Sequence, residues 1–231
     1  MRRFYQTAAV TPAERGYGIA IDGKPIKTPG KRDLRVPTAA LATAIAAEWN
    51  AQADDIRSAD LKLTQLANAA IDRVPAERAA IVQQIADYAG TDLVCYRATR
   101  PPELIARQQA VWQPLVDWAL ERYAAPLEVT AGIVPVAQSA ASLRAFAAAV
   151  DHYDDFALAA LHLATAACGS LIIALALVEG RLDPDQAFAV SQLDESFQIE
   201  KWGEDAEQGQ RRQALADDIA TGARFLTLLR S

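Results

Sequence analysis

The chain has 231 residues, of which 52% are hydrophobic and 23% charged, and this composition is typical of a soluble folded protein with one large or two small domains. Its formal net charge is −6, yet residues 1–37 carry eight Lys/Arg against three acids, so the remaining 194 residues sum to −11. A nucleic-acid-binding protein is more often basic overall, with aromatic residues among its cations. We therefore expect no nucleic-acid partner, and instead a charged protein partner or two domains that face one another.

The first part of the chain predicts short antiparallel strands, at residues 4–10, 17–22, 25–28 and 34–36. Asp22-Gly23 favours a tight hairpin turn between the second and third of these, because glycine accepts a positive φ. Thr38 is a good N-cap for a first helix that should reach about Ala53.

Helical patterns dominate after residue 71, and their starts are marked by proline. Pro75, Pro101-Pro102 and Pro184 stand where first helical turns are expected, whereas Pro114 should kink or break its helix. The sequence therefore predicts an α+β protein. Its two domains are a small N-terminal α+β domain with antiparallel strands, residues 1–71, and a larger all-α helical domain, residues 72–231.

A 23-residue run without formal charge, Phe156–Val178, is long enough to span a bilayer. It is rich in alanine, however, and acidic rather than basic residues precede it: Asp151, Asp154 and Asp155. We expect one central helix buried by other helices, and no stable membrane insertion.

The chain offers little for catalysis. Cys95 and Cys168 lie far apart in apolar surroundings, which predicts buried thiols in a reducing compartment, and no secretory signal is evident at the N-terminus. No phosphate-binding loop, nucleophile elbow or zinc motif is found. The acids and histidine of Asp151–Asp155 could hold a metal in a hydrolase, but helix capping by these acids is the simpler interpretation. We expect no enzyme, no cofactor and no metal.

The most informative stretch surrounds residues 188–202, because on a helix it has two apolar faces instead of one. One face can join the core and holds Val190, Leu193 and Phe197. The opposite face has Glu195 in its middle and holds Phe188, Ile199 and Trp202. Either this second face binds a partner, or Gly203 merely ends the helix while Trp202 packs inward. Residues 194–207 have six acids against one lysine, so a partner should present cations around apolar pockets.

The chain resembles the family of F1-ATPase assembly chaperones that act on the α subunit of the ATP synthase catalytic head. The resemblance runs in order along nearly the whole chain. It rests on Arg3-Phe4-Tyr5, Asp22–Pro29, Ala47-Glu48-Trp49, Thr91–Arg97, Gly169-Ser170, Leu193-Asp194-Glu195, Gln198 and Trp202-Gly203. The segment after Trp202-Gly203 departs from the aromatic content of eukaryotic relatives, and no mitochondrial presequence is seen, as in a bacterial member working in the cytoplasm.

The resemblance implies a two-domain chaperone that shields the subunit interface of an unassembled α subunit until the β subunit binds, without ATP hydrolysis. It marks an acidic position, Asp194 or Glu195, as functionally important. With the second apolar face, this gives the expected client-binding residues: Asp194, Glu195, Phe188, Ile199 and Trp202. We expect the protein to act as a monomer.

Overall fold

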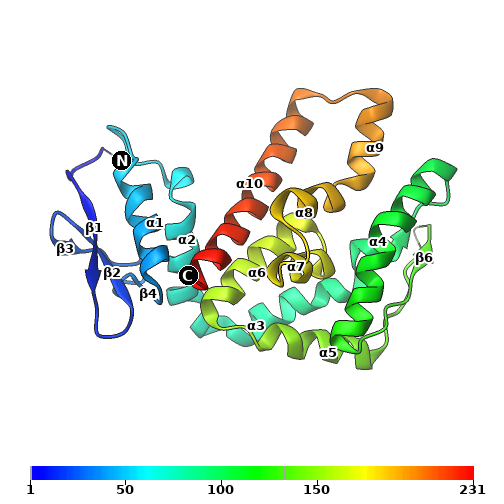
Figure 1. Cartoon of the computed structure of the whole chain (residues 1–231), viewed down its shortest axis with the longest axis horizontal. Coiled ribbons are helices and arrows are strands. Elements are labelled where there is room, and N and C mark those ends of the chain that lie inside the picture. Colours follow the sequence, from blue (N-terminus) through cyan, green and yellow to red (C-terminus); the bar gives the residue numbers. More distant parts are fainter. Residues whose placement is uncertain (1, 133) are drawn as a thin grey trace. The chain divides into compact units, whose positions relative to one another are not determined.

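The computed structural model describes residues 2–132 and 134–231, and the chain forms two compact units (Figure 1). The first unit comprises residues 1–78, 154–160 and 224–231, and the second comprises residues 79–153 and 161–223. The predicted class, a small antiparallel sheet followed by a larger helical region, is confirmed. The domain boundary between residues 71 and 72 stays a prediction.

The first unit holds a four-stranded antiparallel sheet, made of β1 (Ala8–Pro12), β2 (Tyr17–Ile21), β3 (Lys24–Pro25) and β4 (Arg35–Val36). Strand β2 is central and pairs with all three others. Asp22 and Gly23 both have positive φ, which confirms the predicted tight turn. The first strand starts at Ala8 instead of residue 4, because the Asp22 carboxylate accepts hydrogen bonds from the backbone N–H groups of Gln6 and Thr7.

Helix α1 (Ala39–Asn50) packs against β1 and β2 and is capped by Thr38 as predicted. It ends at Asn50, whose side-chain amide pairs with the backbone of Ala8 in β1. Glu48 accepts hydrogen bonds from the N–H groups of Leu63 and Thr64, at 2.7 and 2.9 Å, and so caps α2 (Lys62–Asn68). A 3₁₀ turn, η1 (Ser58–Asp60), lies between α1 and α2 in the chain.

A π-helical turn, η2 (Ala69–Arg73), holds the loop between β3 and β4 in place. Its Asp72 carboxylate accepts hydrogen bonds from Thr28 Oγ1 at 2.8 Å and from Gly30 N–H at 2.7 Å. A Cβ atom at Gly30 would lie only 2.7 Å from that carboxylate. Thr28, in the run Asp22–Pro29 that carries part of the resemblance, therefore has a structural role in this unit.

The helical elements that follow belong wholly or partly to the second unit. They are α3 (Val74–Asp87), η3 (Tyr88–Thr91), η4 (Leu93–Cys95), α4 (Pro102–Tyr123), α5 (Ala140–Asp151), α6 (Asp155–Cys168), α7 (Leu171–Val178), α8 (Pro184–Ser191), α9 (Leu193–Trp202) and α10 (Ala206–Leu229). Two short strands, β5 (Tyr96–Arg97) and β6 (Thr130–Ala131), pair in parallel. Pro114 lies inside α4, and the helix continues through it without a break.

The uncharged run predicted as one central helix is two helices instead. Gly169 has a φ of +64° and ends α6, and the Ser170 side chain then caps α7 by accepting the Ile173 N–H. All eight residues of α7 are buried. Among the described residues, none of the helices is long and apolar enough to cross a membrane.

A buried carboxylate anchors the start of α7. Asp92 is fully buried and accepts hydrogen bonds from Ser170 Oγ at 2.5 Å, Ile172 N–H at 3.1 Å and Val94 N–H at 3.2 Å. Burial raises the pKa of Asp92 to about 6, although these hydrogen bonds oppose the rise. The motif residues Thr91–Arg97 and Gly169-Ser170 thus meet at one buried polar contact.

Candidate functional site

The predicted unbroken helix from Phe188 to Trp202 is wrong. Helix α8 starts as expected, with Asp183 accepting the Gln186 N–H at 2.7 Å and Pro184 in the first turn. It ends at Ser191, and Gln192, with φ −105° and ψ 24°, separates it from α9. Phe188 therefore lies on a different helix from the other predicted site residues.

One face of α9 packs along α4. Leu193 and Phe197 are only 5% and 4% exposed. Arg107 of α4 forms two hydrogen bonds to the Glu200 carboxylate, at 2.7 and 2.9 Å, and its guanidinium lies 5.2 Å from the centre of the Phe197 ring. Burial and a bidentate ion pair together set the orientation of this helix.

Asp194 also turns towards α4. Its Oδ1 accepts a hydrogen bond at 2.8 Å from the amide of Gln108, which is buried. The other end of that amide accepts the Ala98 N–H at 2.7 Å, which fixes its orientation. Burial raises the pKa of Asp194; the Gln108 hydrogen bond and the nearby Arg97 oppose the rise, and Glu195 adds to it. Asp194 is therefore a half-buried anchor of α9.

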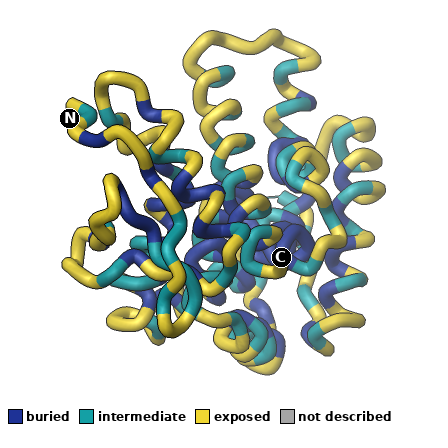
Figure 2. The backbone as a smooth tube through the Cα atoms, turned by 60° about the vertical axis from the view of Figure 1, so that its left-hand side comes forward, coloured by how far each residue is buried: buried dark blue, intermediate teal, exposed yellow. Residues whose placement is uncertain are grey.

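The opposite face of α9 is open. Glu195 is exposed, Ile199 is half-buried and Trp202 is 78% exposed, so Trp202 does not pack inward. At 100° per residue, these three side chains fall within about 60° of one another. The loop after Gly203, at the top of Figure 2, is exposed as well. We call Glu195, Ile199 and Trp202 the outer face of α9.

Arg212 of α10 also contacts α9 and the segment that follows it. Its guanidinium lies 3.1 Å from Ser196 Oγ and 3.3 Å from Glu204, and 5.2 Å from the centre of the Phe188 ring. Phe188 is half-buried beneath this arginine. The structure thus brings Glu195, Ile199 and Trp202 together on one face. Phe188 and Asp194 instead contact other residues of the chain, Arg212 and Gln108.

The metal-site alternative finds no support in the geometry. Asp154 caps α6 by accepting the Ala157 N–H at 2.8 Å, and Asp155 pairs with Arg78 at 2.6 Å. No group of three or more potential metal ligands occurs among residues 2–132 and 134–231. Cys95 and Cys168 are both buried, and burial raises the pKa of each thiol, so neither suits a reactive nucleophile.

Comparison with known proteins identifies the family. The family model of the ATP12 chaperone protein matches residues 2–120, which is half of the chain. The chain belongs to the ATP12 chaperone family. This confirms the resemblance to F1-ATPase assembly chaperones drawn from the sequence, and it places the protein among chaperones and not among enzymes.

Relatives extend the match beyond the family model. The mitochondrial protein atp12 of Schizosaccharomyces pombe is 25% identical over 214 residues, which cover 87% of this chain and 74% of that protein. The crystal structure of Atp12 from Paracoccus denitrificans is 41% identical, with a TM-score of 0.94, over 99% of this chain and 98% of that one. An aspartate-to-lysine mutant of the P. denitrificans protein matches equally well, at 40% identity and the same TM-score and coverage. The ATP12 fold thus extends over α8 and α9, which lie outside residues 2–120.

Proposed function

We propose that this ATP12-family chaperone acts in F1-ATPase assembly by binding the unassembled α subunit and shielding its subunit interface until the β subunit binds. The outer face of α9 is the surface that we assign to the client. In this proposal the protein acts as a monomer in the bacterial cytoplasm and needs no cofactor.

The exposure of Trp202 carries the proposal. A tryptophan that is 78% exposed at the end of a helix is costly for the isolated chain, and buried tryptophans often dominate the binding energy of protein interfaces. Here the inner contacts of α9, with Arg107 and Gln108, hold the helix so that Trp202 remains outside. Glu195 and the acids around the exposed loop favour a cationic rim on the client.

The two predicted acids receive different roles in the proposal. Glu195, which is exposed, contacts a client cation directly. Asp194, held by Gln108, keeps α9 in position and acts on the client through that position. Phe188, beneath Arg212, likewise helps to position α9 and does not contact the client first.

The test is capture of purified F1-ATPase α subunit by variants of this protein. Glu195→Lys should weaken capture about tenfold or more, because one attractive contact becomes repulsive. Asp151→Ala, which changes an acid at the end of α5, should bind as the unmodified protein does. Equal capture by Glu195→Lys and the unmodified protein would overturn the assignment of the outer face of α9 as the binding site. No capture by the unmodified protein would overturn the proposal that the α subunit is the client.

A further inference from the structure

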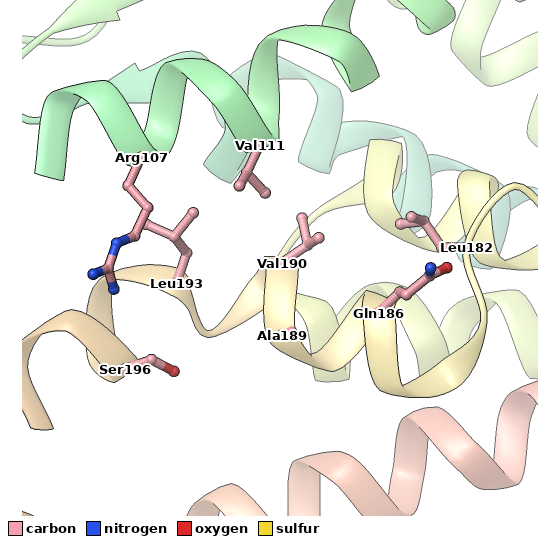
Figure 3. Close-up of a pocket in the computed structure, with 8 residues that line it drawn as sticks. All are labelled: Arg107, Val111, Leu182, Gln186, Ala189, Val190, Leu193 and Ser196. Carbon is pink, nitrogen blue, oxygen red and sulfur yellow. The ribbon is translucent and has the colours of Figure 1, made fainter. Parts of the chain in front are cut away.

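A groove of about 440 Å³ lies between α4 and the α8–α9 pair in the second unit (Figure 3). Its lining is mostly apolar and comprises Arg107, Val111, Leu182, Gln186, Ala189, Val190, Leu193 and Ser196. Leu193, which is buried as the sequence predicts, and Val190, which is half-buried, form part of this wall. Ala189 and Gln186 are exposed, so the groove opens to solvent.

The groove differs from the outer face of α9 in its charge. Its polar lining residues are Arg107, Gln186 and Ser196, and none of the lining residues is an acid. Arg107 is the cation, and its side chain remains 42% exposed although it pairs with Glu200. By charge complementarity, an occupant should therefore be apolar with a negative group at one end, whereas the outer face needs a cation.

We propose that this groove binds an apolar segment of the client α subunit that carries an acidic residue beside its apolar side chains. The proposal rests on the proposed function and adds a second contact to it. A groove of this volume accepts the two or three side chains that one face of an amphipathic segment presents. The client carboxylate would replace or share Glu200 at Arg107, while the outer face of α9 binds the neighbouring cationic rim.

Filling the groove tests the apolar part of the proposal. Ala189→Trp adds a large side chain at an exposed helical position, so the fold should be kept while the groove is occupied. The matched control is Ala148→Trp, at an exposed position of α5. Binding of α should fall about tenfold or more with Ala189→Trp and stay unchanged with Ala148→Trp.

The role of Arg107 is tested by removing, in separate variants, its positive charge and the negative charge of its partner Glu200. Arg107→Gln and Glu200→Gln both remove the same ion pair, so a purely structural role predicts loss of binding in both. Both variants lose the contact that holds α9, but if Arg107 also receives a client carboxylate, Arg107→Gln should weaken binding of α about tenfold more than Glu200→Gln does. Equal losses in the two variants would overturn this part of the proposal.

A small probe separates this proposal from the choice of client. The dye 1-anilinonaphthalene-8-sulfonate combines apolar rings with an anionic group, and it should bind the free protein at one site. Ala189→Trp and Arg107→Gln should abolish or weaken its binding, Ala148→Trp should not, and α should displace it. If α binding depends on Glu195 but is unchanged by Ala189→Trp, the groove does not bind the client and the proposed function stands. If the unmodified protein binds the dye but not α, the α subunit is not the client and both proposals are overturned.

Discussion

Helices α7 and α9 belong to the same unit and have similar lengths, yet they use their apolar residues in opposite ways. All eight residues of α7 are buried, whereas α9 buries only Leu193 and Phe197 and leaves Trp202 outside. Helix α7 is anchored by a buried carboxylate, and α9 by partly exposed ion pairs and one buried glutamine. The contrast is that α7 serves the core, whereas α9 leaves one face open, the face that we propose binds the client.

The largest expected effect is on α7. Leu175→Ala should lower the free energy of unfolding by roughly 3–5 kcal/mol, because it leaves a cavity at a side chain with no exposed surface. Urea unfolding followed by circular dichroism measures this change. A loss below about 1 kcal/mol would contradict the tightly packed core that distinguishes α7.

The anchor of α7 should give stability a pH dependence. Because the pKa of Asp92 is about 6 in the fold and about 4 when unfolded, the folded state holds its proton more tightly. The stabilisation from this group is therefore complete below about pH 4 and is lost as pH rises through 6, by roughly 2–3 kcal/mol. Unfolding free energies at pH 4 and 7 should show this component in the unmodified protein and not in Asp92→Asn, and identical pH profiles would refute it.

A smaller effect is expected where α9 is anchored. Gln108→Met should cost roughly 1–3 kcal/mol of stability, because the Ala98 N–H and the half-buried Asp194 lose their partner. The pKa of Asp194 should rise further, so any loss of α binding at acid pH should begin at a higher pH. Urea unfolding and α binding against pH measure both effects. Gln109→Met, at an exposed position of the same helix, is the control and should change neither.

The smallest effect on stability is expected at the outer face. Trp202→Ala should change the unfolding free energy by no more than about 0.5 kcal/mol, yet weaken α binding about tenfold or more. Leu120→Ala removes another exposed apolar side chain and should affect neither quantity. Titration calorimetry with purified α tests the pair, and unchanged affinity for Trp202→Ala would remove this residue from the interface.

Local signals in the sequence predicted much of the fold. Thr38 and Asp154 cap the helices that they were expected to cap, because capping depends on residues only a few positions apart. Gly169-Ser170 also carried such a signal, a stop followed by a cap, but the uncharged run around it favoured one long helix. The break at Gln192 had no local signal, since glutamine is an ordinary helix former.

The site could be predicted only in part, because only contacts between residues close in the sequence leave a local signal. The 100° spacing placed Glu195, Ile199 and Trp202 on one face, and they share one in α9. The residues that hold this helix were missed because Arg107 and Glu200 are separated by 93 positions, and Gln108 and Asp194 by 86. The groove was missed likewise, since its walls come from distant helices and no periodicity reveals a space between them.

Two arginines from other helices pair with acids of α9 and of the segment after it, and these pairs make the helix responsive to ionic strength. Arg107 pairs with Glu200 in α9, Arg212 pairs with Glu204 just after it, and both pairs are partly exposed to solvent. Salt screens such pairs over about 8 Å at physiological ionic strength. Added salt therefore weakens the ion pairs that hold α9 in position as well as the charged contacts of its outer face. Both changes lower the affinity for the client, and their effects on the affinity multiply. Binding of the client should consequently fall more steeply with salt than a count of charges across the interface alone would give.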